Sequence, residues 1–498
     1  MHSPSPLYQS LCDAAKIAPL MEKRVVNVDD YSQRGLLADS SASERLTVSL
    51  HALMDCLVHE SMPEEVHFDK SLIDLLISQL DQKLSDQLDE ILHHPEFQSL
   101  ESLWRSLAYL AQEADPRSGT KVELLDISKD DLLMDFEESP DSTHSGLYHH
   151  VYTQEYDTPG GEPFSALVAD YFFDKTPQDI SLLKEISRVC ASAHCPFIGN
   201  VDANFFDKDN FEAVMKIKDL SSYFERAEFI RWQSFRKTDD SRYIGLALPR
   251  FLLRLPYGDD TMRVRSFGYA ERVVAEDHKK YLWGAGSFAF AANMARSFKK
   301  HGWTLNIRGP ESGGKVEDLP MHQYDVGAGI QTKIPTEVSI PETREIAFAE
   351  LGFIPLSYYK NSDFACFFSA NSVQLPALYD DDQSQANSRI NSRLPYVLLI
   401  SRLAHYLKVL QRENIGSQKS REHLEGELNQ WLSRWVTRKS SPSADTIAKY
   451  PLSAASVAVH NVPENPGYYR VQLNVVPHFQ VEGMDITLSL ISQLPTKK

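Results

Sequence analysis

The sequence has 498 residues, and its 69 acidic and 51 basic side chains give a formal net charge of −18 at pH 7. This length suggests roughly three domains, and a hydrophobic fraction of 42% is enough to build sizeable cores, which excludes general disorder. The acidic excess argues against nucleic acid or an anionic membrane as the main partner, because both bind cationic surfaces. A large assembly of such chains would have to overcome their mutual repulsion through pairing and burial.

Cysteine usage and hydropathy indicate the compartment. The five cysteines are too few and too scattered for a disulfide framework, which favours a reducing environment. The first residues lack a basic region followed by an apolar run, and no apolar stretch approaches the ~20 residues needed to cross a bilayer. We therefore expect a cytoplasmic protein that does not insert into membranes.

The first 65 residues differ in composition from the rest. Leu7, Tyr8 and Leu11 can line one face of a short helix that Pro19 would end, and a Ser-rich polar stretch follows. Two interpretations stay open. The segment is either a frayed tail or an arm that carries a docking helix, since these side chains have no local core to enter.

Two helices are expected next. In the first, from Asp69 as N-cap to residue 92, apolar side chains recur every three or four residues, among them Leu76, Leu80, Leu84 and Leu88. His93-His94-Pro95 should end it, and a helix-end role is commoner for two adjacent histidines than a metal site. The second helix, residues 96–114, is expected to turn these side chains inward: Leu100, Leu103, Trp104, Leu107 and Leu110.

Short apolar runs alternate with helical patterns between residues 164 and 368. Strands are expected at 166–173, 196–199, 243–248, 303–308, 354–356 and 364–368. Helices are expected at 179–193, 224–235, 287–301 and 342–351. This alternation predicts an α/β layer with a mostly parallel sheet, and the stretches 130–141 and 158–163 are expected to be surface loops.

The C-terminal part changes to two helices followed by β alternation. The helices are expected at 389–411 and 420–436, and the strands at 454–462, 468–480 and 485–493. In the last strand Ile486, Leu488 and Leu490 alternate with polar residues. Such a strand could close the sheet of its own chain or pair with another chain by strand addition, and both alternatives stay open.

One glycine-rich stretch, Gly309–Lys315, matches the phosphate-loop spacing G-x-x-x-x-G-K. Val316 stands where a Ser or Thr hydroxyl would bind magnesium, and Glu311 would put negative charge in the anion cradle. Pro320 follows too soon for the helix whose N-terminus should meet the phosphate. Nucleotide binding at this loop is therefore disfavoured.

A second glycine motif, Gly284–Ala289, matches G-x-G-x-x-A and opens an apolar helix. The dinucleotide fingerprint also needs a buried strand in front, and residues 276–280 are too charged for one. The glycines are better explained by close packing of the helix.

The sequence also lacks a complete motif for metal binding or for nucleophilic catalysis. Of Cys190, His194 and Cys195, only the first two share a helical face, and no second pair of ligands follows at finger-like spacing. Buried apolar cysteines are the commoner case. The sequence contains no G-x-S-x-G, H-E-x-x-H or C-x-x-C pattern. We therefore expect no metal, no cofactor and no catalytic residue.

Many longer strings of this sequence resemble one family. They are FDK (68–70), ILHHPEFQSLESLWR (91–105), WG (283–284), RGPESGG (308–314), PTE (335–337), ELGFIPL (350–356), SRLPY (392–396), RLAHYLK (402–408), YPL (450–452), NPG (465–467) and PHFQ (477–480). In order and together, over about residues 66–494, they resemble the large-subunit family of the type VI secretion contractile sheath, TssC, also called VipB or EvpB.

The resemblance implies a fold and a domain order. It implies a contractile tail-sheath-like α/β body at residues 66–372, followed by a C-terminal α+β domain of the gpW/gp25 type, residues 373–498, with an antiparallel sheet. Residues 1–65 would be a flexible N-terminal arm. Both glycine motifs then become structural loops of the family.

The resemblance also implies the partners. In this family the small sheath subunit TssB forms an obligate heterodimer with TssC, and the heterodimers polymerise as a helical sheath around a tube of Hcp hexamers, attached to a baseplate. Contraction drives the tube and spike outward, and the AAA+ ATPase ClpV then disassembles the sheath.

Three sets of residues are candidate sites under this interpretation. Leu7, Tyr8 and Leu11 are the candidate ATPase-docking helix. Ile486, Leu488 and Leu490 are the candidate inter-subunit strand, and the candidate assembly helix carries Leu76, Leu80, Leu84 and Leu88.

Two other functions remain as alternatives. One is a nucleotide-dependent enzyme that uses the Gly309–Lys315 loop. The other is the sheath of a related phage-tail-like injection machine, which would need no ATPase-docking helix because it is used once.

Overall fold

The computed structural model describes residues 70–461 and 469–478, apart from 266, 275–276, 326–328, 417–418, 438 and 440–441. The chain divides into two compact units, Met1–Ile91 with Tyr257–Glu271, and Leu92–Pro256 with Arg272–Lys498. Within the described ranges, no helix has both the length and the apolar character needed to cross a membrane.

The α-helices are α4 Lys70–Leu92, α5 Pro95–Glu113, α6 Lys129–Glu138, α7 Gly146–Tyr148, α8 Pro177–Ala193, α9 Phe211–Met215, α10 Leu220–Phe224, α11 Ile230–Arg236, α12 Gly286–His301, α13 Glu342–Glu350, α14 Asp382–Asn391, α15 Leu394–Glu413, α16 Arg421–Leu432 and α17 Ala444–Lys449. The strands are β1 Leu167–Phe173, β2 Phe197–Val201, β3 Ile244–Leu248, β4 Phe251–Leu252, β5 Trp283–Gly284, β6 Lys315–Val316, β7 His322–Asp325, β8 Ile330–Lys333, β9 Ile354–Tyr358, β10 Ala365–Phe367, β11 Leu452–Asn461 and β12 Tyr469–Pro477. Short 3₁₀ turns and a π-helix, His149–Asp157, connect them.

A six-stranded sheet in the order β1-β2-β3-β9-β10-β6 forms the centre of the body. The pairs from β1 to β9 are parallel, whereas β10 pairs antiparallel with both β9 and β6. Strands β2 and β3 are buried along their whole length, as expected for parallel strands covered on both faces. The predicted α/β layer with a mostly parallel sheet is confirmed.

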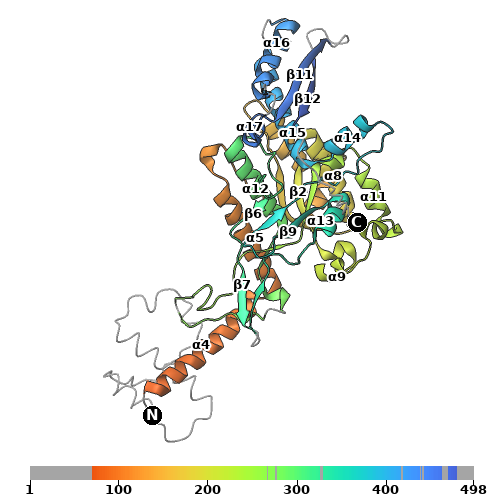
Figure 1. The fold of residues 1–498 in the computed structure, drawn as a ribbon. Helices are drawn as coiled ribbons and strands as arrows, with labels where there is room; N and C mark the ends of the chain where they lie inside the picture. Colours follow the sequence, from red (N-terminus) through yellow and green to blue (C-terminus); the bar gives the residue numbers. More distant parts are fainter. Residues whose placement is uncertain are drawn as a thin grey trace, which may run out of the picture. The chain divides into compact units, whose positions relative to one another are not determined.

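Alternate residues of the central strands enter two different cores. Leu246 of β3 lies with residues of α8 and α11 in one hydrophobic cluster, and Ala247 lies with residues of α12 in another. Helices α8 and α12 therefore cover opposite faces of the sheet (Figure 1). At the start of α12, the Asn200 Oδ1 accepts the Ser287 N–H at 2.8 Å, and the Asn200 amide donates to the Ala169 carbonyl. These bonds tie the helix to β1 and β2.

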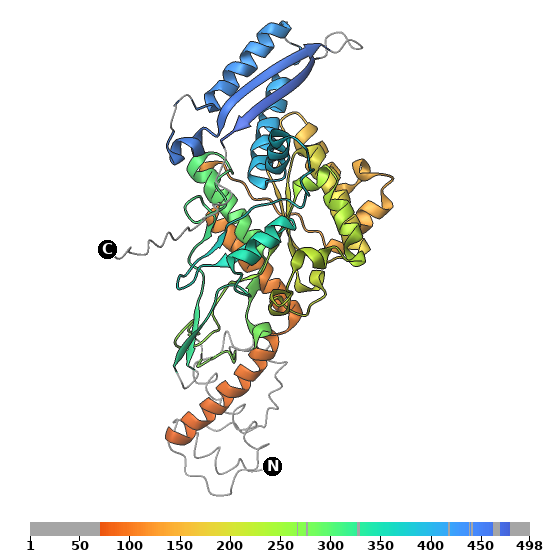
Figure 2. The same cartoon turned by 45° about the vertical axis from the view of Figure 1, so that its right-hand side comes forward.

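The C-terminal part is a two-stranded antiparallel sheet covered by helices. Strands β11 and β12 pair from Leu452↔Pro477 to Asn461↔Tyr469. Their inner face packs with α15 and α16 around Leu403, Leu428 and Val457 (Figure 2). The two predicted helices and the first two predicted strands of this region are therefore confirmed, although residue 393 divides the first helix into α14 and α15. Pro395 in the first turn of α15 explains the division, because proline is tolerated there and not in a helix interior.

The expected strand at residues 303–308 is wrong. The segment is irregular although Trp303, Leu305 and Ile307 are buried. The first two side chains enter the C-terminal core and the third enters the core beneath α12, and β6 takes the place beside β10. The alternating apolar side chains of this segment therefore pack into two separate cores, and its backbone joins no described sheet.

The acidic stretch 130–141 is also not a loop over most of its length, because α6 occupies it. Ser128 caps this helix by accepting the Asp131 N–H, and Leu132 is buried. Two aspartates in the first turn suit the positive end of the helix dipole. In addition, the expected helix at 224–235 begins only at Ile230 as α11, after the separate short α10.

Candidate assembly surfaces

Helix α4 exposes an apolar stripe. Ile77, Leu80, Leu84 and Ile91 are between 41% and 50% exposed, and Leu88 on the same face is half-buried. The side chain of Leu76 lies outside the described residues. Three of the four predicted assembly-helix residues thus share one face. Monomeric soluble proteins rarely expose contiguous apolar surface of this kind without a use for it.

A polar face of the same helix is the buried one. Ser85 and Asp89 are buried, and the Tyr269 hydroxyl donates to the Asp89 carboxylate at 2.7 Å from the Tyr257–Glu271 segment of the same unit. The usual pattern for a surface helix is the reverse, with apolar residues inward. Because Ser85 and Asp89 face the inside of the unit, the apolar stripe of α4 faces outward and is available to bind another protein surface.

The outer edge of β12 is open among the described residues. Its side chains alternate between half-buried and exposed, with Val471, Leu473 and Val475 on the inner face. These three reach only partial burial because no further described strand continues the sheet beyond β12. An edge of this kind is a template for strand addition from another chain.

The outer edge of β11, in contrast, is occupied by α16. The Asn429 amide donates to the Val457 carbonyl at 2.8 Å, and its oxygen accepts the Val457 N–H at 2.9 Å. The Glu425 carboxylate accepts the Val459 N–H at 3.1 Å. Helix and hairpin run side by side in both views (Figures 1 and 2).

Helix α15 joins the C-terminal sheet to the body. The Lys408 ammonium lies 3.1 Å from the Asp157 carboxylate, and the Arg412 guanidinium donates to the Thr158 carbonyl at 2.7 Å. The imidazole Nε2 of His405 lies 2.9 Å from the Ala193 carbonyl, and burial lowers the pKa of this histidine to about 4. His405 is therefore neutral at pH 7, with its Nε2 proton directed to that carbonyl.

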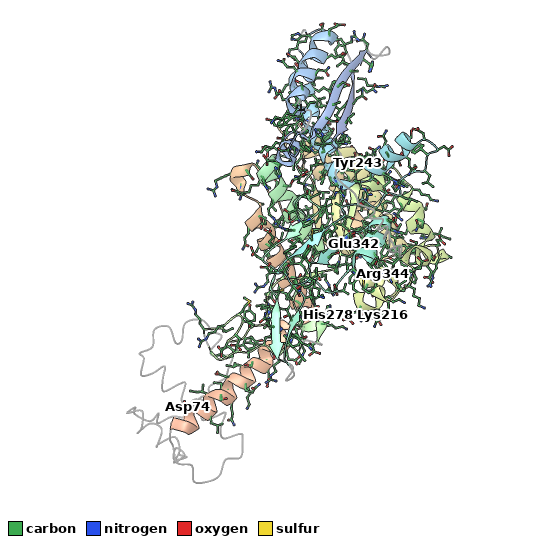
Figure 3. The ribbon with its side chains drawn as sticks, viewed as in Figure 1. Asp74, Lys216, Tyr243, His278, Glu342 and Arg344 are labelled. Atoms are coloured by element: carbon green, nitrogen blue, oxygen red, sulfur yellow. The ribbon has the colours of Figure 1, made fainter. Side chains whose placement is uncertain are left out.

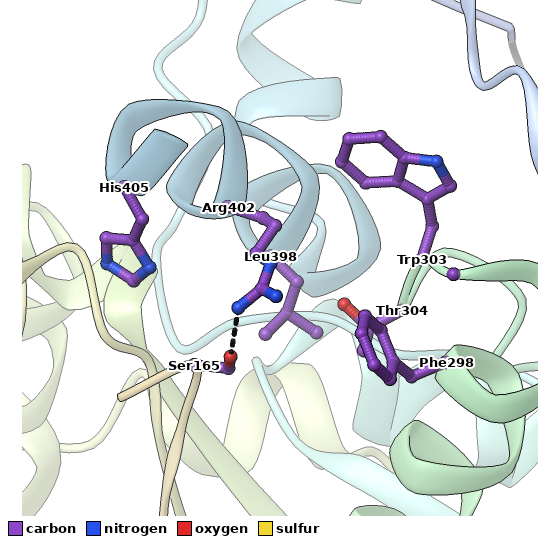
Figure 4. A pocket seen from close by; sticks show the side chains of 8 residues that line it. Ser165, Phe298, Trp303, Thr304, Leu398, Arg402 and His405 are labelled. Carbon is purple, nitrogen blue, oxygen red and sulfur yellow. Dashed lines mark hydrogen bonds between the residues drawn. The ribbon is translucent and has the colours of Figure 1, made fainter. Parts of the chain in front are cut away.

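A small cavity of about 20 Å³ lies beside this junction (Figure 4). Arg402 crosses it, donates to the Ser165 hydroxyl at 3.1 Å and stacks on Phe298. The cavity has room for one water molecule, which is too little for a substrate. Its polar groups belong to packing between the body and α15.

An ion cluster around the buried carboxylate of Glu337 fixes the segment after β8. The Arg250 guanidinium meets both Glu337 oxygens, at 2.6 and 3.1 Å. The imidazole of His278, which is labelled in Figure 3, lies 3.1 Å from the first oxygen. Burial alone would raise the pKa of the Glu337 carboxyl, but the hydrogen bonds from His278 and Arg250 outweigh it and lower the pKa to about 2. The carboxylate therefore stays ionised at every physiological pH.

The Gly309–Lys315 loop is a tight turn on β10. The Gly309 N–H donates to the Phe367 carbonyl at 2.7 Å, and the Ser312 and Gly314 N–H groups donate to the Gly309 carbonyl. A phosphate cradle needs such amides to converge on the ligand, whereas here they are used within the protein. A Cβ atom at Gly314 would lie 2.4 Å from the Gly309 nitrogen, so this contact requires glycine.

The other two motifs are structural as well. A Cβ at Gly284 would lie 2.7 Å from Leu253, and one at Gly286 would lie 3.1 Å from Ala247, which confirms that these glycines allow close packing. Cys190 and Cys195 are fully buried, and burial raises the pKa of both thiols. Among the described residues, no group of three or more His, Cys, Asp or Glu is placed to hold a metal ion.

Two predicted sites lie outside the described residues. These are the candidate docking helix with Leu7, Tyr8 and Leu11, and the candidate inter-subunit strand with Ile486, Leu488 and Leu490. Both stay predictions.

Comparisons with known proteins match most of this chain. The model of the EvpB/VC_A0108 tail sheath N-terminal domain matches residues 74–374, and the model of the EvpB/VC_A0108 tail sheath gpW/gp25-like domain matches residues 383–494. The chain belongs to the EvpB/VipB tail-sheath family. It is 41% identical over 430 residues to "Type VI secretion system sheath protein TssC1" of Pseudomonas aeruginosa PAO1, which is 86% of each chain.

Solved structures give weaker matches. A chain of the cryo-EM structure of the anti-feeding prophage baseplate aligns with 75% of this sheath-family chain and 83% of its own length, at 10% identity and a TM-score of 0.35. A chain of the contracted helical sheath of the same prophage aligns with 62% of this chain and 66% of its own, at 10% identity and a TM-score of 0.31.

Sequence reasoning missed some exposed apolar surface of this sheath-family chain. Leu100 and Trp104 are 53% and 60% exposed, although the periodicity predicts that they face inward. Of the five side chains predicted to face inward, Leu103, Leu107 and Leu110 lie with residues of α12 in one cluster. The irregular stretch after α5 exposes Leu124 at 66%. The sequence did carry a signal for this exposure: the apolar face of helix α5 is too wide to be covered by a single packing partner.

Proposed function

We propose that this chain is the large subunit of a type VI secretion contractile sheath, in which it pairs with the small subunit TssB and polymerises as a helical sheath around the Hcp tube. Membership of the tail-sheath family makes it a structural sheath subunit. The single observation that supports the assembly role is the outer edge of β12, which no other described strand pairs with and whose apolar side chains are only half-buried.

The proposed organisation has an arm at residues 1–65, a sheath body at 66–372 and a C-terminal domain at 373–498. Strand 485–493 of one subunit would pair with a neighbour, since its nine residues equal the length of β12 and its apolar residues alternate as an added strand requires. The stripe on α4 would contact another subunit of the assembly.

The proposed energy source is the assembly itself. An extended lattice stores free energy in subunit contacts and releases it on contraction as those contacts increase. The subunit then needs no hydrolytic site of its own. We place it in the cytoplasm, in a sheath attached to an envelope-anchored baseplate, and assign its recycling to the ClpV ATPase.

Co-expression with the small sheath subunit tests this function. We expect tubules by negative-stain electron microscopy, with both chains present in the pelleted fraction. If the two chains stay soluble and separate over a range of salt concentrations, the proposal is wrong.

The docking helix has its own test. Replacing Leu7 and Leu11 by Asp should leave assembly intact but slow disassembly by the ATPase, because the docking face would lose its apolar contacts. Gln9→Asp with Ser10→Asp adds the same charge beside that face and should disassemble like the wild type. If both double variants are disassembled by the ATPase at the same rate, Leu7 and Leu11 do not form the docking site.

A further inference from the structure

The backbone of the β11–β12 hairpin has two outer edges, and their hydrogen bonds are distributed unequally. In an antiparallel pair, residues whose N–H and C=O do not bond to the partner strand point outward. Val457 uses both groups on Asn429, so the Val457↔Leu473 pair is of the type that does not exchange hydrogen bonds. The alternation then directs the backbone groups of Val471, Leu473 and Val475 away from β11, toward the outer edge of β12.

The outer edge of β11 is occupied at Leu452, Val457 and Val459. At its start the Thr437 N–H donates to the Leu452 carbonyl at 2.9 Å. Farther on, Asn429 satisfies both groups of Val457, and Glu425 accepts the Val459 N–H. The Asn429 amide also donates to the Glu425 carbonyl of its own helix at 2.8 Å, which holds the side chain in place.

Helix α16 is held against this edge by more than polar contacts. Its Leu428 and Leu432 are buried in the same cluster as Val457 and Val459 of β11. A strand arriving at β11 would have to displace the helix together with its hydrogen bonds. On β12, a strand would meet outward-pointing backbone groups that no other described residue engages, next to half-buried apolar side chains.

We propose that Asn429 and Glu425 are positioning residues that close one edge of the sheet, so that only the β12 edge accepts a strand from a neighbouring subunit. This inference rests on the proposed function and deepens it. Closure matters because an edge strand pairs with any suitable strand. A sheet open on both sides could join neighbours in two ways, whereas a sheet open on one side gives the lattice a single geometry.

Hydrogen–deuterium exchange on the full chain tests edge closure before any assembly. In the free chain, the amides of Val457 and Val459 should exchange slowly and those of Val471, Leu473 and Val475 quickly. The variant Asn429→Ala should speed exchange at Val457 by about tenfold, the effect of one lost hydrogen bond. The matched control Gln430→Ala changes an exposed side chain of the same helix and should leave that rate unchanged.

Assembly with the small subunit tests whether a neighbouring strand pairs with β12 and not with β11. In wild-type tubules the β12 amides should become protected while Val457 and Val459 keep their rates.

Three results would overturn the inference: new protection on assembly at Val457 and Val459, quick exchange of these two amides in the free wild type, or an unchanged Val457 rate in Asn429→Ala. A lack of tubules from the wild type would refute the proposed function instead. The exchange rates of the free chain would still decide whether α16 closes the edge.

Discussion

Glu337 shows how single side chains hold the body together. Its carboxylate accepts hydrogen bonds from Arg250 and His278, and its own N–H donates to the Arg250 carbonyl. The ring of His278 stacks on Trp283, whose indole N–H donates to the His278 carbonyl. One buried charge therefore fixes three segments that are far apart in the sequence.

Removing that charge should be costly. Glu337→Gln leaves Arg250 without its carboxylate, but the Arg250 side chain is 36% exposed and water replaces part of the lost contact. We expect a cost of about 2–3 kcal/mol, or roughly 2–3 °C in Tm for a chain of this length. Differential scanning fluorimetry at pH 7 measures the shift. Asp277→Asn removes an exposed ion pair with Lys280 and should change Tm very little. Equal shifts in the two variants would contradict a special role for the cluster.

The same cluster predicts a pH dependence. The pKa of Glu337 is lowered from 4.5 to about 2 in the folded chain, so the unfolded chain binds its proton more readily. Its contribution to stability is therefore complete above pH 4.5 and is lost as the pH falls toward 2. The Tm difference between wild type and Glu337→Gln should narrow over this range. A difference that is constant from pH 6 to pH 3 would contradict the assignment.

Helix α4 exposes a row of large apolar side chains, among them Leu80 and Leu84. Leu80→Asp with Leu84→Asp should abolish tubules without unfolding the chain, because both side chains are more than 40% exposed. Gln79→Asp with Gln87→Asp adds equal charge on exposed positions of the same helix. Circular dichroism and electron microscopy of the co-expressed pairs give the comparison. Tubules from both variants would show that the stripe is not an assembly contact.

The terminal strand gives a second prediction at this scale. A chain ending at Met484 lacks residues 485–498 and should form no tubules, while its Tm stays close to that of the wild type. A chain ending at Leu494 keeps the strand and should assemble normally. Normal tubules from the shorter chain would refute strand exchange.

Strands and helices were predictable where they pack within the layers of the central sheet. The buried runs of β2, β3 and β9 and the faces of α8 and α12 follow their periodicity, because each packs on a single sheet. The strand predicted at residues 303–308 is wrong because these residues pair with no described strand, although Trp303 and Leu305 enter the C-terminal core and Ile307 enters the core beneath α12. The edge closure by Asn429 was not predictable, since an Asn on a helix carries no sign of the strand it will meet 28 residues later.

Charge acts at the scale of the whole molecule. With a net charge of −18, copies of this chain repel one another. Raising the ionic strength from about 0.01 to 0.15 M shortens the screening length from about 30 to 8 Å. The critical concentration for assembly should therefore fall severalfold, as measured by sedimentation of tubules. A rise would mean that ion pairs between oppositely charged patches dominate the lattice contacts.

Helix α15 has a mechanical consequence. Its 20 residues span about 30 Å, and it contributes Val397, Leu398 and Leu403 to three separate cores. Its bonds to the body, at His405, Lys408 and Arg412, follow one another by about one turn. A neighbour that pulls on β12 would load these bonds in parallel, as shear along a stiff rod. They would have to break together and not one after another, so the β11–β12 sheet would transmit such a force to the body without peeling from it.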